Sequence, residues 1–215
     1  MSARDRILAR IGKALGRSDA AQIDTCLATH ARGPAPPRLD NPVAHFKERA
    51  LMLSSDVMEA ASMADVPAML AHHLAERGLP SQGVCWPALA DLPWHGAGLD
   101  IEARPANDRD LLGVTGAFCA IAETGTLMML SGPETPPSVS LLPETHVAIV
   151  ATGRIVASME DAWDLLRREC KQPPRAVNFI SGPSRTADIE QTVTLGAHGP
   201  YRVLVVLVGD KTYDL

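Results

Sequence analysis

The sequence predicts an α/β protein built on a mainly parallel β-sheet that helices cover on both faces. Two observations carry this prediction. Continuous apolar runs, such as residues 147–150 and the part of residues 202–208 that follows Arg202, are typical of strands buried on both faces of a parallel sheet. These runs alternate along the chain with segments of helical periodicity, such as residues 160–170, and that alternation is typical of the α/β class.

The individual elements follow from local patterns. A first helix is expected over residues 4–17, where apolar residues recur at helical spacing behind Ser2 as the N-cap. Another helix is expected from Asp65, with Pro67 in its first turn, to a stop at Gly78. Further helices are expected at residues 44–53, 160–170 and 186–195. Strands or apolar runs are expected at residues 56–60, 84–86, 99–103, 117–122, 126–130, 147–150, 176–180 and 202–208.

The N-terminal part of the chain is predicted to form an arm outside the compact domain. Four prolines between residues 31 and 42 exclude a helix and favour an extended linker or strap. The helix before them is basic, but its apolar stripe is narrow and lacks an aromatic residue. We therefore expect it to dock on its own domain or on a partner subunit, and not on a membrane. Residues 1–44 are assigned to this arm and residues 45–215 to one α/β domain.

Composition excludes several classes of function. The chain has 215 residues, of which 21% are charged and 4% aromatic, and its net charge is −5, so a nucleic-acid or anionic-membrane binder is not expected. The cysteines Cys26, Cys85, Cys119 and Cys170 form no C-x-x-C pair, so the chain is not expected to hold an iron–sulfur cluster. Scattered cysteines, no secretory signal and no apolar run of about eighteen residues together predict a cytoplasmic protein without a membrane span.

A first candidate segment breaks two apolar runs with Glu123, Thr124, Gly125 and Thr126. Glu123 has the chemistry of a general base, a nucleophile or an acceptor for a ligand hydroxyl. Gly125 permits a positive φ or a close approach of the backbone. The alternative is a hairpin or bulge whose glutamate simply faces water, and the spacing alone does not separate the two.

A second candidate segment follows the strand expected at residues 176–180. A turn of Ser181, Gly182, Pro183 and Ser184 leads to Arg185, and a helix is expected to begin near Thr186. Backbone N–H groups at a helix N-terminus, three hydroxyls and one guanidinium would form a pocket for a carboxylate or phosphate. The alternative is an ordinary helix cap with Asp188 in the first turn. Ligands of parallel sheets bind at the carboxyl ends of strands, and that rule favours this segment and the first one.

Two histidines beside turns are weaker candidates. His198 lies in the run Gly196-Ala197-His198-Gly199-Pro200, and His146 begins the strand expected at residues 147–150. Either ring has the chemistry of an acid–base or ligand group, although such histidines are more often structural. The sequence has no metal-binding histidine pattern, dinucleotide fingerprint, Walker loop or nucleophile elbow, so the common enzyme templates are absent.

Four segments resemble the LUD-domain family, and in particular its lactate-utilisation members. They are Ala122-Glu123-Thr124-Gly125-Thr126, Ser140-Leu141-Leu142-Pro143 with His146, the run Ser-Gly-Pro-Ser-Arg-Thr-Ala-Asp-Ile-Glu at residues 181–190, and Leu195-Gly196-Ala197-His198-Gly199-Pro200. The resemblance covers about residues 45–208, and the run at 181–190 is its most specific part.

The resemblance implies a three-layer α/β sandwich similar to the group of ribose-5-phosphate isomerase, glucosamine-phosphate isomerase and CoA-transferase. It implies a part in the oxidation of L-lactate to pyruvate by a three-component system whose other members are iron–sulfur proteins. This chain would bind no cofactor itself; it would be the subunit without a cluster and would bind a small organic anion such as lactate. The resemblance defines no catalytic residue, so Glu123 is the candidate catalytic residue on its side-chain chemistry alone. The candidate ligand contacts are Thr124, Gly125, Thr126, His146, Ser181, Gly182, Ser184, Arg185, Thr186, Asp188 and His198.

Two alternatives to this function stay open at the level of sequence. The chain is a stand-alone isomerase or CoA-transferase-like enzyme with Glu123 as base or nucleophile, or it is a regulatory subunit that only binds an anion. The sequence also departs from relatives in one place. They often carry a basic residue just before the Leu-Leu-Pro segment, whereas this chain has Val139-Ser140 there. If that residue helps to hold a carboxylate in the relatives, either Arg185 works alone in this chain or the ligand differs.

Overall fold

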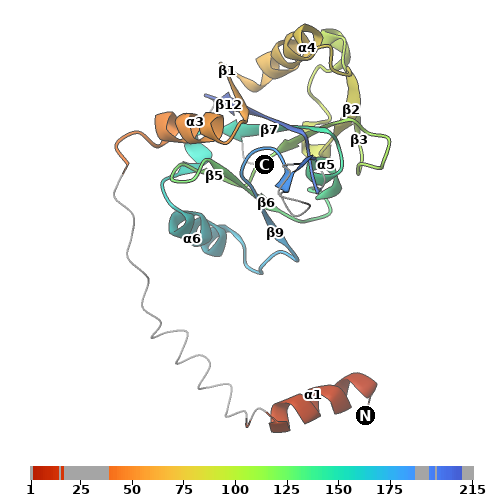
Figure 1. The fold of residues 1–215 in the computed structure, drawn as a ribbon, viewed down its shortest axis with the longest axis vertical. Coiled ribbons are helices and arrows are strands. Elements are labelled where there is room, and N and C mark those ends of the chain that lie inside the picture. Colours follow the sequence, from red (N-terminus) through yellow and green to blue (C-terminus); the bar gives the residue numbers. More distant parts are fainter. Residues whose placement is uncertain (1, 15, 17–38, 187–193, 197, 210–215) are drawn as a thin grey trace. The chain divides into compact units, whose positions relative to one another are not determined.

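The main sheet of the protein contains six strands, all parallel, in the order β1-β12-β7-β4-β2-β3 (Figure 1). The structure is a computed structural model that describes residues 2–14, 16, 39–186, 194–196 and 198–209. The predicted α/β class and mainly parallel sheet are confirmed. In sheet order, the strands are β1 (Asp56–Ala60), β12 (Arg202–Val208), β7 (Thr145–Ala151), β4 (Leu112–Gly116), β2 (Gln82–Cys85) and β3 (Asp100–Ala103).

A second, smaller sheet takes three of the apolar runs. Its order is β8-β5-β6-β9, with β5–β6 and β6–β9 antiparallel and β5–β8 parallel. One face, including Ala120 and Leu127, belongs to the core of the main sheet, and the other, including Ile121 and Met128, packs with Leu166 of α6. Burial on both faces explains why β5 and residues 127–130 of β6 are apolar, whereas β9 is partly exposed and contains Asn178. The strands are β5 (Cys119–Ile121), β6 (Thr126–Leu130), β8 (Ile155–Val156) and β9 (Val177–Ile180).

The predicted helices of the domain at residues 44–53, 65–78 and 160–170 are confirmed within a few residues. Helix α3 begins behind Asn41, whose side chain accepts the backbone N–H of Ala44 at 3.1 Å. Helix α6 begins with a capping box between Ser158 and Asp161. No described helix is long and apolar enough to cross a membrane. The helices are α3 (Pro42–Met52), α4 (Val66–Glu76), α5 (Ser138–Leu141) and α6 (Met159–Glu169), with 3₁₀ turns η1 (Met63–Asp65), η2 (Pro87–Leu89), η3 (His95–Ala97) and η4 (Thr152–Arg154).

The chain divides into two units, Met1–Pro37 and Arg38–Leu215. Within the first unit the structure describes helix α1 (Ala3–Ala14), which confirms the predicted helix through Ala14. Ser2 and Asp5 cap its start reciprocally, since each side chain accepts a backbone N–H from the other residue. The apolar side chains of this helix are exposed.

The helix predicted at residues 186–195 is wrong at both of its ends. Strands β10 (Arg185–Thr186) and β11 (Thr194–Leu195) pair antiparallel there, and residues 187–193 lie outside the described residues. The Gly196 N–H donates to the Ser184 carbonyl at 2.9 Å and closes this ladder. β-Branched residues at both ends of the segment also favour extended backbone over helix.

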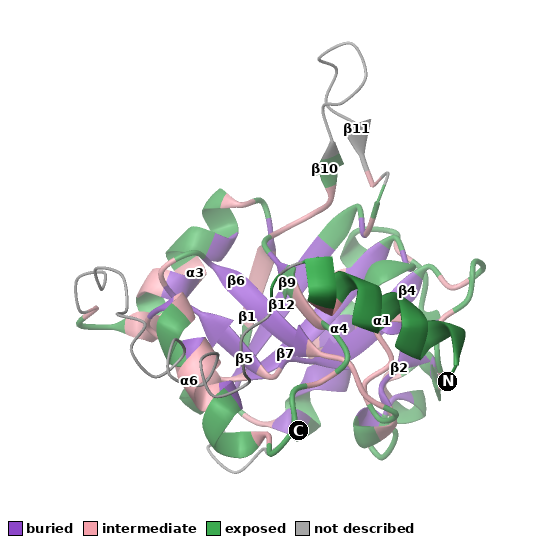
Figure 2. Cartoon of the chain, turned by 90° about the horizontal axis from the view of Figure 1, so that it is seen from below, coloured by how far each residue is buried: buried purple, intermediate pink, exposed green. Residues whose placement is uncertain are grey.

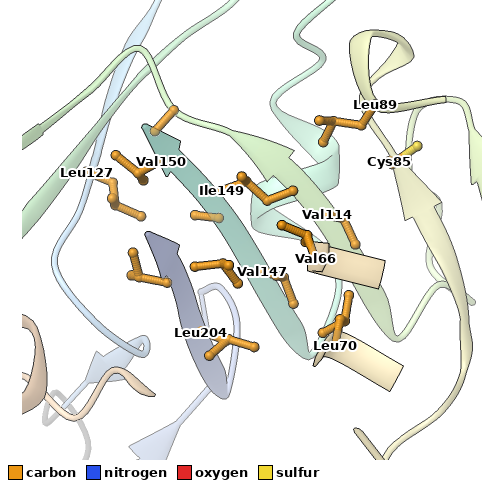
Figure 3. Packing of buried hydrophobic residues seen from close by; sticks show 14 of the residues in the cluster. Val66, Leu70, Cys85, Leu89, Val114, Leu127, Val147, Ile149, Val150 and Leu204 are labelled. Atoms are coloured by element: carbon orange, nitrogen blue, oxygen red, sulfur yellow. The ribbon is translucent and has the colours of Figure 1, made fainter. Parts of the chain in front are cut away.

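The hydrophobic core lies on both faces of the main sheet. On one face, Val66 and Leu70 of α4 pack with Val114, Val147 and Ile149 (Figure 3). The buried surfaces of β5, β6 and β7 are purple in Figure 2. Burying each of these side chains stabilises the fold by about 1.5–3 kcal/mol.

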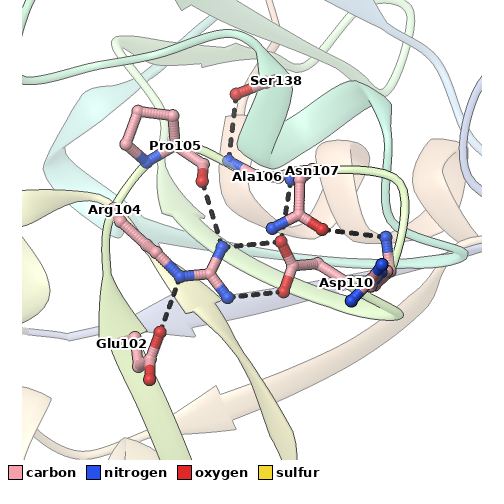
Figure 4. Close-up of polar contacts among 8 residues, drawn as sticks. Glu102, Arg104, Pro105, Ala106, Asn107, Asp110 and Ser138 are labelled. Atoms are coloured by element: carbon pink, nitrogen blue, oxygen red, sulfur yellow. Dashed lines mark hydrogen bonds and ion pairs between the residues drawn. The ribbon is translucent and has the colours of Figure 1, made fainter.

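A polar clamp holds the connection from β3 to β4 (Figure 4). The Arg104 guanidinium donates from Nη1 and Nη2 to the two carboxylate oxygens of Asp110 at 2.7 and 2.8 Å, and from Nε to Glu102 at 2.6 Å. Hydrogen bonds from Arg104 hold the pKa of the Asp110 carboxyl below its usual value. The clamp fixes the segment that carries the chain from edge strand β3 past β2 to β4.

Candidate functional site

The segment around Glu123 forms the turn of the β5–β6 hairpin, so the hairpin interpretation is confirmed. The Gly125 N–H donates to the Ile121 carbonyl at 2.9 Å, and Gly125 has a φ of +67°. Glu123 is half-buried, and its backbone N–H donates to Ala157 at 3.0 Å. Within the described residues its carboxylate has no hydrogen bond or ion pair, so its catalytic role stays a prediction.

A row of hydroxyls connects this turn to the segment that follows β9. The Thr124 hydroxyl donates to that of Thr126 at 2.8 Å, and the Thr126 hydroxyl lies 2.7 Å from that of Ser181. Antiparallel pairing of β6 with β9 sets this arrangement, since Leu127 faces Ile180 and places Thr126 opposite Ser181. The fold thus brings together two segments that are more than fifty residues apart in sequence.

Both segments lie closely against the last turn of helix α3. A Cβ atom on Gly125 would stand 2.7 Å from the backbone nitrogen of Ala50, and one on Gly182 would overlap the backbone carbonyl of Leu53. Gly182 has a φ of +82°, which only glycine adopts without strain. These glycines therefore permit the end of α3 to form one wall of the site.

Ser54, which the sequence analysis did not single out, completes this wall. The Ser54 N–H bonds to Leu51 and the Ser55 N–H to Ala50, which is the Schellman ending of a helix. Ser54 takes the left-handed position usual for glycine, with a φ of +66°, and its hydroxyl accepts a hydrogen bond from Arg185 Nη2. No local pattern marks this residue, because its importance depends on a contact 131 residues away.

The third segment joins the second through the backbone. The Ser184 N–H donates to the Pro200 carbonyl at 2.9 Å, and Gly199 lies beside the Ser184 side chain. His198 is exposed on this segment. The side chain of Thr186 and all of Asp188 lie outside the described residues. We name the exposed residues Ser54, Ser181 and Arg185, together with the buried Thr126 behind Ser181, the Arg185 cluster.

The Arg185 cluster differs from the expected anion pocket in two respects. Arg185 and Thr186 belong to β10, so no helix begins at that point, and the predicted contribution of helix N–H groups is wrong. The cluster also lies near the amino ends of β1 and β12, because Ser54 precedes β1 and Pro200 precedes β12. The rule for carboxyl ends of strands fails here because β9 belongs to the smaller sheet.

The chemistry of the Arg185 cluster nevertheless suits an organic anion. Arg185 is exposed, and within the described residues no carboxylate pairs with its guanidinium. A guanidinium binds a carboxylate through two parallel hydrogen bonds, and neighbouring hydroxyls both donate and accept. The cluster therefore offers a charge for a carboxylate beside groups that match a ligand hydroxyl.

His146 lies in the core and contributes no surface to this cluster. Its side chain is 0% exposed, Nε2 lies 2.8 Å from the Thr115 hydroxyl, and Nδ1 has no hydrogen-bond partner among the described residues. Burial lowers the pKa of His146 to about 4, so the ring is neutral at physiological pH. A ligand contact of His146 stays a prediction, and the observed contacts give the ring a structural partner only.

The described residues contain no cluster of three or more metal-ligating side chains. Cys85 and Cys119 are buried free thiols, and burial raises their pKa values to about 11 and about 12. Such thiols are protonated and inert, so they behave as core residues.

Comparisons with known proteins agree with the fold. Residues 91–208 match the family model of the LUD domain. A lactate utilization protein C of Bacillus subtilis is 39% identical over 113 residues, covering 51% of this chain and 45% of that protein. Its namesake in Exiguobacterium is 40% identical over 117 residues, covering 51% of each. The match spans about half the length of these curated relatives.

One solved structure resembles the chain over most of its length. It is the crystal structure of a DUF162-family protein from Deinococcus radiodurans, with a TM-score of 0.62 and 23% sequence identity, and the match covers 81% of this chain and 100% of that one. At this identity the likeness concerns the fold alone. The family-model match begins after α3, so it does not include Ser54.

Proposed function

Because the chain belongs to the LUD domain family, we propose that it acts in lactate utilisation and holds a small organic anion, such as lactate, at the Arg185 cluster. The relatives from Bacillus subtilis and Exiguobacterium are named lactate utilization protein C, and these names support the proposed role in lactate utilisation. One fold serves many functions, so anion binding has to be argued from the residues of the Arg185 cluster.

The proposal rests on the meeting of three separate segments, those of Ser54, Thr126 and Ser181–Arg185, beside one exposed arginine. The Ser54 hydroxyl, just after α3, accepts a hydrogen bond from the Arg185 guanidinium, and the Ser181 hydroxyl, in the turn before Arg185, lies 2.7 Å from that of the buried Thr126. Lactate presents a carboxylate with a hydroxyl on the neighbouring carbon. Arg185 would bind that carboxylate, and the hydroxyls would select a ligand that carries its own.

The oxidation itself is proposed to require partner subunits. Lactate loses two electrons and two protons when it becomes pyruvate, so the reaction needs an electron acceptor. The cysteines of this chain form no C-x-x-C pair. We propose that iron–sulfur clusters in partner proteins accept these electrons while this chain holds the anion.

Replacing Arg185 by alanine should weaken lactate binding about 10- to 100-fold, because hydrogen bonds to a charged group contribute about 1.5–3 kcal/mol. The melting temperature should change little, because an exposed arginine contributes little to stability. Isothermal titration calorimetry with lactate, pyruvate and phosphate measures the first effect, and a thermal melt measures the second. Absence of binding heat from all three anions with the natural sequence would remove the proposal.

Two variants separate charge at the cluster from charge in general. Arg168→Ala removes an exposed arginine from α6 and should leave lactate binding unchanged.

Ser54→Gly should change thermal stability and lactate binding in opposite directions. It relieves the positive φ and raises the melting temperature by about 2–4 °C, yet it releases the guanidinium and weakens binding. If Ser54→Gly and Arg185→Ala both bind lactate normally, the anion lies elsewhere.

Affinity purification of the chain from lactate-grown cells tests the partners. We expect iron–sulfur proteins to co-purify, with the brown absorbance of their clusters. A chain that purifies alone and converts a sugar phosphate or an acyl-CoA, with the activity lost in Glu123→Gln, would establish the stand-alone enzyme instead.

A further inference from the structure

The strand order of the main sheet contains a point where the direction of winding reverses. From β2 the chain proceeds to β3 on one side, and then returns to β4 on the other side of β2. The Arg104–Asp110 clamp fixes this return. The connections that follow the neighbouring strands β2 and β4 therefore lead away in opposite directions. In parallel α/β sheets such a point leaves a crevice outside the carboxyl ends of the two strands, where ligands bind.

A cavity of about 180 Å³ lies at this position. Trp86 directly follows β2, and Ala117 and Phe118 directly follow β4, where the chain passes to the second sheet. The cavity is lined by Trp86, Ala117, Phe118, Leu130 and Thr135. It lies at the carboxyl ends of the parallel strands, whereas the Arg185 cluster lies near the amino ends, so the two sites are separate.

The aromatic walls of this cavity are held in place. Trp86 is 2% exposed, and its indole N–H donates to the Pro136 carbonyl at 3.3 Å, which fastens the segment that contains Thr135. The Arg154 guanidinium lies 4.8 Å from the centre of the Phe118 ring and donates to the Phe118 carbonyl. Glu169 binds the same guanidinium with both carboxylate oxygens. A cavity with fixed walls requires little ordering when a ligand enters.

The chemistry of the lining selects an uncharged group. None of the five lining residues is ionisable, two are aromatic, and the Thr135 hydroxyl is their one side-chain hydroxyl. An apolar cavity of about 150 Å³ accommodates benzene. We propose that this cavity is a second binding site, which takes a planar, uncharged part of a small organic ligand, about the size of one six-membered ring. This inference does not depend on lactate binding at Arg185.

Phenol is a suitable probe, because it combines a ring of this size with a hydroxyl. We expect it to bind with a dissociation constant on the order of 1 mM or tighter. The protein has three tryptophans, which give separate indole N–H signals in a ¹H–¹⁵N spectrum. Phenol should move the signal of Trp86 and leave that of Trp94, whose N–H donates to Leu89, unchanged. Single Trp→Phe variants assign the signals.

A filled cavity provides the decisive comparison. Ala117→Leu places three carbons into the space and should weaken phenol binding at least tenfold, while Ala68→Leu on the exposed face of α4 should leave it unchanged. If Ala117→Leu does not fold, Leu130→Phe replaces it. The proposal fails if phenol at ten times the expected dissociation constant leaves the Trp86 signal in place. It also fails if a variant with the cavity filled folds and still binds phenol as the natural sequence does. Neither result affects the calorimetry at Arg185.

Discussion

Replacing Gly182 by alanine is expected to lower the free energy of unfolding by about 3 kcal/mol. Two costs add at this position. A φ of +82° places an alanine Cβ close to its own backbone, and the same Cβ would overlap the backbone carbonyl of Leu53. The nearest atoms belong to the backbone and Cβ of Leu53, which cannot turn away as the end of a flexible side chain can. Either the end of α3 or the turn at Ser181 therefore has to move. Urea unfolding followed by circular dichroism measures the change.

Gly98→Ala is the matched control for this variant. Gly98 has nearly the same φ, +80°, but a Cβ there would meet nothing within 4 Å. Its substitution should cost about 1 kcal/mol, the penalty of the left-handed backbone alone. The difference between the two variants therefore measures how tightly α3 is seated on the loop. Equal losses would show that the end of α3 is not a fixed wall of the Arg185 cluster.

Local patterns were sufficient to predict the elements whose environment is uniform along their length. Strands β7 and β12 are buried along most of their length, so residues 147–151 and 203–208 are all apolar and predict a strand without ambiguity. Helix α6 carries its start signal within four residues, in the capping box of Ser158 and Asp161. In these cases the residues that determine the structure lie within the element itself.

Three residues of the Arg185 cluster stand in motifs that the sequence shows, but their arrangement could not be predicted from it. The motifs containing Thr126, Ser181 and Arg185 do come together, but through pairing of β6 with β9, which involves residues far apart in sequence. The helix expected after Arg185 was wrong because pairing with Leu195 decides that backbone, and this partner is not visible in the local pattern. Ser54 was missed for the same reason.

The rule for carboxyl ends concerns parallel strands, but the strand expected at residues 176–180 is β9, which pairs antiparallel with β6 in the smaller sheet. Once β9 is placed in the smaller sheet, the rule for carboxyl ends applies to β2 and β4, and it leads to the cavity beside Trp86. The rule was valid, but it required knowing which strands are parallel neighbours.

His146 is expected to make the protein markedly less stable in acid. Burial lowers its pKa from 6.5 to about 4 in the folded protein. Between these two values the unfolded chain binds a proton that the folded chain does not, so stability falls as the pH drops below 6.5 and the loss is complete near pH 4. A difference of this size corresponds to about 3 kcal/mol. Urea unfolding at pH 7, 6, 5 and 4 measures it.

The double variant Thr115→Val/His146→Leu isolates this contribution. It removes both partners of the buried 2.8 Å contact, so neither hydroxyl nor ring is left unpaired, and at pH 7 its stability should be near that of the natural sequence. Carboxyls such as Asp110 and Glu169, whose pKa values hydrogen bonds from arginine lower, also lose stability in acid, but they do so equally in both proteins. The two stability curves should therefore separate progressively from pH 6.5 downward, with the natural sequence losing more. Parallel curves would mean that the pKa of His146 is the same in the folded and the unfolded protein, as when a water molecule binds Nδ1 and stabilises the protonated ring.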